Sequence, residues 1–330
     1  MTDRTSLGGT VAPVHVGEGD FRYEVNQGWG HLPDGWYLHE VAAVGVDSRD
    51  NVYVFNRGKH PVIVFDRAGN FLRSWGEDIF QRAHGLHVAP DDTLFLTDDA
   101  DHTVRHCTPE GKVLLTLGVP GKPAPFMSNV PFHRCTHTAL TPNGDILVSD
   151  GYGNAAIHKF SPDGRHLKSW GRCGIGQGEF NIPHNIACDA DGWVYVADRE
   201  NHRIQVFDSD GRYETQWNTV HRPCGLFMPR CSCPLCYVGE LGPALALTRD
   251  YPNLGPRLSV LDHKGRVLAR IGVAETGLAP AQFIGPHGLA VDSRGDIYVG
   301  EVARTVWPTV WPDKPVPPDL RCLRKLIKVP

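Results

Sequence analysis

The sequence predicts an all-β fold, a six-bladed β-propeller that forms a single domain over residues 1–330. Three observations support this. A similar segment recurs along the chain with a period of roughly 40–50 residues, which is typical of propellers. Each copy holds four short strands with alternating apolar residues, and no helical periodicity competes with them. The copies also account for most of the chain.

Six copies align at the first residue of their first strand. They begin at Ala42, His84, Thr136, His184, Cys224 and His287, and the copy at Cys224 is degenerate. In each, an apolar strand leads through a turn to a second alternating strand, such as 193–196. A third strand follows, such as 204–207, and an Asp-Gly turn, such as Asp210-Gly211, leads to the fourth. Such turns favour hairpins because primed turns need positive φ. Each copy is therefore predicted to be one blade.

The last copy supplies only three strands and ends in RCLRKLIKV near the C-terminus. Fourth strands elsewhere end in tryptophan, as at Trp75, Trp170 and Trp217. The same ending, Trp29-Gly30, closes the segment FRYEVNQGWG near the N-terminus. The N-terminal strand is therefore predicted to complete the last blade, which removes open sheet edges. Residues 1–17 are expected to be a flexible N-terminal segment.

Three proline-rich insertions interrupt the blade pattern. They are residues 119–132, 242–255 and, in the last blade, 303–318. None of them resembles a strand of any copy. Long loops on a rigid scaffold commonly carry function. We therefore expect these loops to cover one end of the channel or to border a functional site.

Composition narrows the class of protein and its partners. The net charge is −4 with histidine neutral, whereas a nucleic-acid partner usually requires a basic surface. The chain has no run of about 18 apolar residues that would span a membrane, and its N-terminus does not resemble a signal peptide. The nine cysteines are scattered, so we expect a cytoplasmic protein without nucleic-acid or membrane partners. The oligomeric state stays open.

The first strand of each blade lines the channel of a propeller, so the six aligned positions should form a ring. His84, His184 and His287 occupy alternate blades of this ring, two repeats apart in each case. Three imidazoles with one open position are a common catalytic zinc arrangement, and the open position can hold water or a substrate oxygen. The spacing indicates zinc or another divalent transition metal. Structural hydrogen-bonding histidines are the alternative.

A second ring is predicted where the second strands end. Most blades place an acidic residue there, which we expect to bond to neighbouring loops. Arg57 and Arg199 break this pattern, and a guanidinium fork suits a substrate carboxylate. An ion pair with a neighbouring blade is the alternative. Tyr152 is placed at the same level, where its hydroxyl can serve as a general acid or base.

Several motifs resemble the peptidyl-α-hydroxyglycine α-amidating lyase family, an NHL-type six-bladed propeller. They are NRG at 56–58, HGL at 84–86, SDGYGN at 149–154, PHNIA at 183–187, ADRENHRIQVF at 197–207 and PHGLAV at 286–291. The resemblance extends over roughly residues 38–302. The family's three zinc ligands, essential tyrosine and two functional arginines match His84, His184 and His287, Tyr152, and Arg57 and Arg199.

The resemblance implies a lyase that splits the N–C bond of an N-acyl carbinolamine, R–CO–NH–CH(OH)–COOH, into an amide and glyoxylate. The metal would acidify the substrate hydroxyl, Tyr152 would accept its proton, and Arg57 and Arg199 would hold the carboxylate. The 330 residues are accounted for by the propeller, so we expect no attached hydroxylating monooxygenase domain. A small hydroxylated carboxylate metabolite is therefore expected as substrate rather than a peptide hormone.

Three positions depart from the family pattern. Secreted members carry a cysteine directly after DGY, where this chain has Gly153, which fits a reducing compartment. The family's methionine ahead of the last histidine is replaced, with Gly285 here. The family's acid after that histidine helps to hold a structural calcium ion. Gly288 stands there in this chain, which leaves structural calcium in doubt.

Four cysteines, Cys224, Cys231, Cys233 and Cys236, lie close together in the fifth copy. Their spacing does not match the paired knuckles of a zinc ribbon. One interpretation is free thiols packed at a turn and in the channel wall. The other is that Cys224, which stands in the channel ring, contacts substrate or metal.

Three functions follow from these patterns. The first is the metal-dependent lyase. The second is a metal-dependent hydrolase, lactonase-like, that uses the same three-histidine site. The third is a non-catalytic NHL interaction scaffold, which needs no histidine ring. Metal content separates the scaffold from the enzymes. Substitution of Arg57 or Arg199 separates the lyase, which needs a carboxylate clamp, from the hydrolase.

Overall fold

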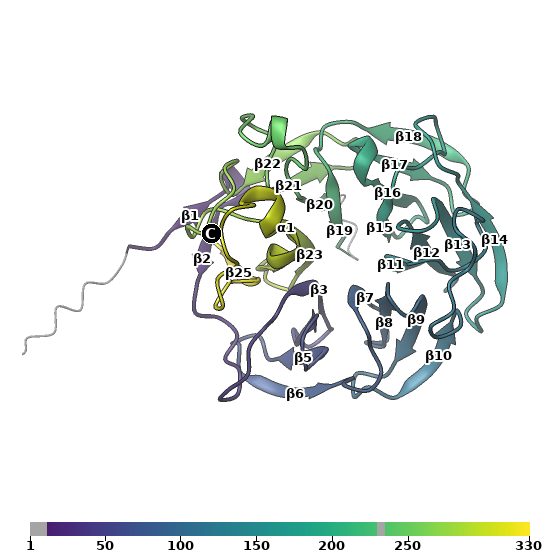
Figure 1. Ribbon diagram of the computed structural model, residues 1–330, viewed down its shortest axis with the longest axis horizontal. Coiled ribbons are helices and arrows are strands. Elements are labelled where there is room, and N and C mark those ends of the chain that lie inside the picture. The colour runs from purple at the N-terminus through teal and green to yellow at the C-terminus, as the bar shows by residue number, and fades with distance from the viewer. Residues whose placement is uncertain (1–11, 230–234) are drawn as a thin grey trace, which may run out of the picture.

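The computed structural model describes residues 12–229 and 235–330, and these form a six-bladed β-propeller (Figure 1). The predicted fold class is thus confirmed. Six antiparallel sheets surround the central channel, and the first strand of each blade faces it. The described residues contain no helix of the length and apolarity that would cross a bilayer.

Five blades each contain four antiparallel strands that run from the channel outward in chain order. The first blade has β3 (Val41–Val46), β4 (Val52–Asn56), β5 (Val62–Phe65) and β6 (Phe71–Trp75). The second has β7 (Ala83–Val88), β8 (Leu94–Asp98), β9 (Thr103–Cys107) and β10 (Val113–Leu117). The third has β11 (His137–Leu140), β12 (Ile146–Asp150), β13 (Ala156–Phe160) and β14 (His166–Trp170).

The fourth blade has β15 (Pro183–Cys188), β16 (Val194–Asp198), β17 (Arg203–Phe207) and β18 (Tyr213–Trp217). The fifth has β19 (Pro223–Phe227), β20 (Leu235–Glu240), β21 (Arg257–Asp262) and β22 (Val267–Ile271). Among the described residues, three short 3₁₀ turns lie outside the strands, at Gly19–Phe21, Arg199–Asn201 and Ala246–Thr248.

The sixth blade joins the two ends of the chain. It contains β23 (Pro286–Val291), β24 (Ile297–Glu301) and β25 (Leu323–Lys328), followed outward by β2 (Tyr23–Asn26) and β1 (His15–Val16). The predicted closure by the N-terminal strand is confirmed, because β2 pairs with β25 from Tyr23–Lys328 to Asn26–Lys325. A fifth strand, β1, lies inside the stretch expected to be flexible, residues 1–17. Residues 1–11 of that stretch lie outside the described residues.

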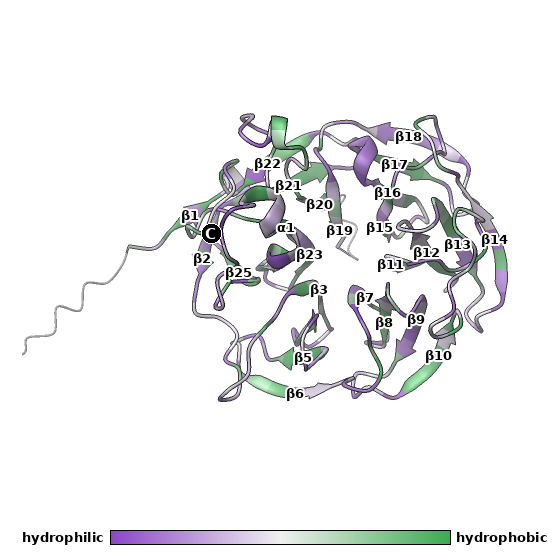
Figure 2. Cartoon of the chain, viewed as in Figure 1, coloured by the Kyte–Doolittle hydropathy of each residue, from purple (hydrophilic) through white to green (hydrophobic). Residues whose placement is uncertain are grey.

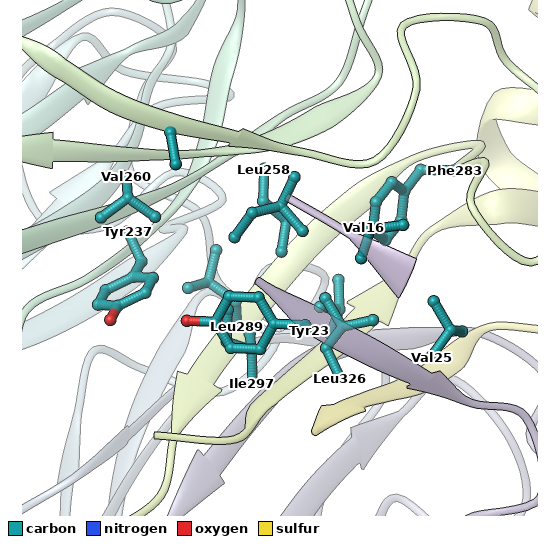
Figure 3. Close-up of a cluster of buried hydrophobic side chains, with 13 residues drawn as sticks. Val16, Tyr23, Val25, Tyr237, Leu258, Val260, Phe283, Leu289, Ile297 and Leu326 are labelled. Atoms are coloured by element: carbon teal, nitrogen blue, oxygen red, sulfur yellow. The ribbon is translucent and has the colours of Figure 1, made fainter. Parts of the chain in front are cut away.

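Apolar side chains hold the N-terminal strands in place (Figure 3). Val16, Tyr23 and Val25 pack in one buried cluster with Leu326 of β25 and Ile297 of β24. The cluster continues into the fifth blade through Leu258 and Val260. Burial of these side chains supplies the free energy for ring closure at roughly 25 cal/mol per Å² of apolar surface.

The tryptophans that end the fourth strands pack against the following blade. A Cβ atom added at a turn glycine of that blade would lie 2.6 Å or less from a tryptophan ring in three cases: Gly111 with Trp75, Gly211 with Trp170 and Gly265 with Trp217. Across the closure, a Cβ at Gly69 would lie 3.0 Å from the Trp29 ring. The Trp-Gly pattern in the sequence is therefore an inter-blade contact, and Trp29 repeats it at the closure.

Outer strands are only half covered. Figure 2 shows hydrophobic stretches, coloured green, on the outer strands β6 and β10 at the rim. Leu72 of β6 and Leu114 of β10 are exposed, whereas the inner strands β4 and β8 are buried throughout. Solvent thus reaches the rim of the propeller, and the core lies between the blades.

The three insertions lie at one end of the propeller, because connections from second to third strands and from fourth to first strands share that end. We call it the site face. Residues 303–318 were expected as a loop, and this is wrong for their first half, which forms the helix α1 (Ala303–Val310). Ala303, Trp307 and Val310 lie buried along one side of it, a helical spacing that the proline content of the segment obscured.

Candidate metal centre and active site

The three predicted histidines meet at the channel axis. His84 lies on β7, His184 on β15 and His287 on β23, and all three are buried. Their ring centroids are 4.7–4.9 Å apart. One ligand nitrogen from each ring lies within 4.8 Å of the others. Within the part of the chain that the structure describes, this is the group of His, Cys, Asp or Glu side chains that could hold a metal ion.

A β-bulge turns each histidine toward the axis. The pairing of β7 with β8 skips His84, since Ala83 pairs with Asp98 and Gly85 with Thr97. The same irregularity falls at His184 and at His287. A bulge leaves one residue outside the ladder and re-aims its side chain. The strand register therefore explains why these residues point into the channel.

Backbone carbonyls of the neighbouring blades fix the tautomer of each ring. The Nδ1–H of His84 donates to the carbonyl of Thr136 (2.7 Å), that of His184 to Cys224 (2.8 Å) and that of His287 to Ala42 (2.6 Å). A carbonyl can only accept, so Nδ1 carries the proton and Nε2 keeps a free lone pair. Metal-binding histidines are oriented in this way.

Thr136, Cys224 and Ala42 are the remaining members of the aligned ring. The three blades without a histidine thus orient the histidines of the other three. Burial lowers the pKa of all three imidazoles well below 6.5, so the rings are neutral, as metal ligands must be. The donor set fits a divalent metal such as zinc.

Close approach of the inner strands requires glycine after two of the histidines. A Cβ at Gly85 would lie 2.5 Å from the carbonyl oxygen of Thr136, and one at Gly288 would lie 2.5 Å from Cα of Ala43. Any side chain at either position would push neighbouring blades apart. The chain therefore has no room at Gly288 for an acidic calcium ligand.

The hydroxyl of Tyr152 lies against the histidine ring. It is 3.0 Å from Nε2 of His84 and 3.0 Å from Nε2 of His184. Burial raises the pKa of Tyr152 above its usual value, and the nearby guanidinium of Arg199 opposes this. Tyr152 is thus the phenol positioned to exchange a proton with a molecule bound at the three Nε2 atoms.

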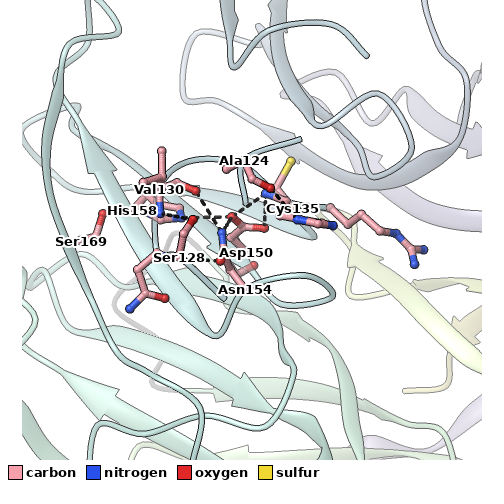
Figure 4. A network of polar contacts seen from close by, with 12 residues as sticks. Ala124, Ser128, Val130, Cys135, Asp150, Asn154, His158 and Ser169 are labelled. Carbon is pink, nitrogen blue, oxygen red and sulfur yellow. Dashed lines mark hydrogen bonds and ion pairs between the residues drawn. The ribbon is translucent and has the colours of Figure 1, made fainter. Parts of the chain in front are cut away.

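The insertion before the third blade holds the turn that carries Tyr152 (Figure 4). Asp150 accepts hydrogen bonds from the backbone N–H of His133 (2.9 Å) and from Nδ2 of Asn154 (2.8 Å), and it contacts Nε2 of His158 (3.2 Å). Asn154 in turn donates to the carbonyl of Val130 (3.0 Å). This buried network ties residues 119–135 to the turn and so positions the phenol.

Gly153 is packed against His133, and this predicts the effect of a substitution. A Cβ at Gly153 would lie 1.9 Å from Cδ2 of His133. Gly153→Cys is therefore expected to lower the free energy of unfolding by about 1–3 kcal/mol through overpacking. Chemical denaturation checks this. Gly28→Ala is the control, because a Cβ there meets only a side-chain oxygen at 4.0 Å. Equal stability of Gly153→Cys and wild type would contradict the packing argument.

The two predicted arginines lie beside the same centre. The Arg199 guanidinium carbon is 5.6 Å from the Tyr152 ring centroid, and its Nε donates to Glu200 (2.7 Å). Arg57 donates through Nε to the carbonyl of Ala83 (2.9 Å), next to His84, and through Nη1 to Glu40 (2.9 Å). Each arginine has an acidic partner and further N–H groups.

Helix α1 supports this side of the site. The backbone N–H and hydroxyl of Thr305 donate to the carboxylate of Glu40 at 2.6 and 2.9 Å, which holds the partner of Arg57. Val306 packs on Cys224, and a Cβ at Gly285 would lie 2.9 Å from its methyl group. The insertion in the last blade therefore borders the site.

The acidic residues at the ends of the second strands bond to loops, as expected. Each accepts a backbone N–H from the connection that enters its own blade: Asp98 from Arg82, Asp150 from His133, Asp198 from Asn181, Glu240 from His221 and Glu301 from Ile284. These carboxylates hold the loops of the site face at the channel mouth.

Cys224 contacts a histidine without joining the ligand group. Its Sγ lies 3.4 Å from Nδ1 and 3.8 Å from Nε2 of His184, and burial raises its pKa to about 12. Cys236 packs in a different apolar cluster, so the structure does not bring these two thiols together. Cys231 and Cys233 lie outside the described residues.

A cavity of about 890 Å³ occupies the channel on the opposite side of the histidine ring. Ala42, His84, Thr136 and His287 form one end of its wall, and Tyr152, Arg57 and Arg199 take no part in it. The three Nε2 atoms therefore separate two chemically different spaces. The site face carries the charged groups, and the channel beyond the ring is lined largely by inner-strand residues.

Two further arginines, which the sequence motifs did not indicate, reach the same centre. The guanidinium carbon of Arg134 lies 4.8 Å from the Tyr152 ring centroid, and Arg134 and Arg82 both donate to Asp99. Both stand in loops just before first strands, two residues ahead of aligned ring positions. That offset was the available indication in the sequence.

Comparisons with known proteins show which proteins this chain is similar to. A model of the NHL repeat matches residues 180–207. Human NHL repeat-containing protein 3 is 31% identical over 294 residues, which cover 85% of this chain and 81% of that protein. Peptidyl-alpha-hydroxyglycine alpha-amidating lyase 1 of Drosophila melanogaster is 33% identical over 308 residues, which cover 80% of this chain and 56% of that enzyme.

Among solved structures, a gluconolactonase from Xanthomonas campestris superposes with a TM-score of 0.57 at 11% identity, covering 93% of this chain and 89% of that one. At this identity the likeness concerns the fold alone. The same propeller architecture therefore occurs in a protein named as a gluconolactonase.

Proposed function

Because the chain belongs to the amidating-lyase-like family of NHL-repeat six-bladed propellers, we propose that it is a metal-dependent lyase. It cleaves the C–N bond of a small α-hydroxy-amide carboxylate and releases an amide and an aldehyde such as glyoxylate. The observation that carries the proposal is the contact of the Tyr152 hydroxyl with Nε2 of both His84 and His184 at 3.0 Å.

His84, His184 and His287 would hold the metal through Nε2. A divalent cation such as zinc supplies Lewis-acid polarisation of the substrate hydroxyl oxygen. The protein supplies the rest. Its carbonyl-bonded imidazoles stay neutral and correctly turned, and the loops of the site face surround the reacting groups.

Tyr152 moves the proton. The phenolate of Tyr152, which the Arg199 cation helps to stabilise and a bound divalent cation would stabilise further, takes the proton of the carbinol hydroxyl. The C=O bond of the aldehyde then forms and the C–N bond breaks. The proton passes to the departing amide nitrogen, so that R–CO–NH–CH(OH)–COO⁻ becomes R–CO–NH₂ and OHC–COO⁻. Such positioned acid–base groups contribute roughly 10²–10⁴-fold to a rate.

Arg57 and Arg199 hold the substrate carboxylate. Both lie beside the histidine ring with side chains that are mostly buried, and charge-assisted hydrogen bonds strengthen when water is excluded. We place the reaction in a reducing compartment such as the cytoplasm. This placement rests on the buried thiols Cys107, Cys135, Cys224, Cys236 and Cys322, which are free.

The direct test is release of glyoxylate from α-hydroxyhippurate by protein loaded with one equivalent of zinc. Arg199→Gln is expected to lower kcat/KM about 10- to 100-fold, since hydrogen bonds to charged groups contribute about 1.5–3 kcal/mol. Zinc content should stay unchanged. Arg212→Gln, in an exposed ion pair on another loop, is the control and should match wild type.

Other outcomes identify the alternative functions. Hydrolysis of a neutral lactone at equal rates by wild type and Arg199→Gln, without glyoxylate release, would identify a metal-dependent hydrolase. A folded protein that binds no zinc and turns over neither compound would identify an interaction scaffold.

A further inference from the structure

We propose that Arg82 and Arg134 form a second anion-binding pair, which selects substrates whose acyl portion carries its own negative charge. This inference rests on the proposed lyase function and names its substrate class more closely. The substrate would be an N-acyl-α-hydroxyglycine with a second carboxylate or comparable anionic group on the acyl chain.

Most N–H donors of the Arg82 and Arg134 guanidinium groups make no hydrogen bond to the described residues. Nη1 of Arg82 and Nη2 of Arg134 lie 2.8 and 2.7 Å from the same oxygen, Oδ2 of Asp99. Across the described ranges, neither guanidinium makes another hydrogen bond. Each guanidinium carries five N–H donors, so most of them remain for a ligand. Two cations share one carboxylate, and an anion is the natural further partner.

The pair is open to solvent and lies next to the reacting groups. The side chains of Arg82 and Arg134 are 35% and 40% exposed, whereas Asp99 between them is fully buried. Arg134 also lies over the Tyr152 ring at 4.8 Å. Arg134, and through Asp99 Arg82, is therefore within reach of a molecule that binds against Tyr152.

Asp99 is an unusual anchor. Its Oδ1 is buried and has no hydrogen-bond partner in the part of the chain that the structure describes. Its neighbour Asp98 is bonded to backbone N–H groups of Gln81, Arg82, Ala100 and Asp101. A buried carboxylate that binds two arginines through one oxygen fixes the orientation of both guanidinium groups.

The backbone of Arg134 points to the same conclusion. Its φ is 62°, in the left-handed region, and its N–H donates to Nδ1 of His102 (3.1 Å). A residue with a side chain is disfavoured in that region, and such positions cluster at binding sites. The fold thus maintains an unfavourable conformation that presents an arginine at the channel mouth.

The arrangement is repeated on the other side of Tyr152. Arg199 and Arg222 share Glu200, as Arg82 and Arg134 share Asp99. With the Arg57–Glu40 pair, five arginines meet three carboxylates in these contacts. The two shared acids, Asp99 and Glu200, follow the second strands of the blades on either side of the blade of Tyr152, and two such groups match a molecule with two separate anionic groups.

Steady-state kinetics with two substrates tests the pair. N-succinyl-α-hydroxyglycine carries a terminal carboxylate, and N-butanoyl-α-hydroxyglycine is its neutral match. Wild type should prefer the succinyl compound at least 10-fold in kcat/KM, mainly through KM. Arg134→Gln and Arg82→Gln should each reduce this ratio about 10-fold. Arg172→Gln, whose side chain is exposed in an ion pair with Glu179, should leave it unchanged.

A ratio near one in wild type would overturn the proposal. Variants that lower kcat/KM for both substrates by the same factor would also overturn it, because arginines that only hold the loop in place would have that effect. Binding of N-succinylglycine and N-butanoylglycine, measured by calorimetry, covers the case in which neither compound turns over. Tighter succinyl binding that Arg134→Gln removes would support the pair while the lyase function fails, and equal or absent binding would overturn the pair.

Discussion

Replacing His184 with alanine is expected to remove the bound metal and with it the release of glyoxylate. Among the residues that the structure describes, these three histidines are the group that could hold the metal, and a pair of imidazoles binds zinc far more weakly than three. Zinc affinity should fall more than ~100-fold, which exceeds the usual effect of losing an outer-shell partner. Elemental analysis of purified protein and a glyoxylate assay measure both effects.

His87→Gln is the matched control, since His87 lies on β7 with His84 and belongs to no ligand group within the described residues. It should retain one equivalent of zinc. Retention of full zinc content by His184→Ala would show that the metal binds elsewhere.

Tyr152→Phe is expected to separate metal binding from catalysis. Phenylalanine keeps the ring that packs against Arg134 and Arg199 and removes only the hydroxyl that lies 3.0 Å from the two Nε2 atoms. Zinc content should be unchanged and KM similar. The kcat for glyoxylate release should fall about 10²–10⁴-fold, the usual contribution of acid–base catalysis.

Two other results for Tyr152→Phe would each assign a different role to the tyrosine. Activity within a few-fold of wild type would assign the proton transfer to another group. A parallel loss of zinc would assign the tyrosine a role in holding the metal. Tyr213→Phe, on the outer strand β18, serves as the control and should match wild type.

Much of the fold was predictable because the blades repeat. The strand periods and Asp-Gly turns define each blade locally, and the Trp29-Gly30 ending identifies the closing strand from its residues alone. Trp29 packs on Gly69 of the first blade, as the other tryptophans pack on glycines of the blade that follows, and for this reason the shared ending marks the closing strand. Helix α1 was not predicted, since its proline-rich sequence conceals a buried stripe that is visible only where it packs with Ile284 and Leu320 in the folded chain.

The histidines were predictable from alignment, whereas their orientation was not. It depends on bulges in the strand pairing and on carbonyls that lie 40 or more residues away along the chain, as for His184 and Cys224. The pairing of Arg82 and Arg134 on Asp99 was likewise hidden, because their shared offset of two residues ahead of a ring position does not show that both side chains reach one carboxylate.

Diffraction data collected on both sides of the zinc absorption edge, from crystals of the zinc-loaded protein, test the metal centre most directly. We expect one anomalous peak on the propeller axis, equidistant from Nε2 of His84, His184 and His287 and close to the Tyr152 hydroxyl. A peak at another site, or imidazoles turned so that Nε2 leaves the axis, would contradict the metal centre and the lyase built on it.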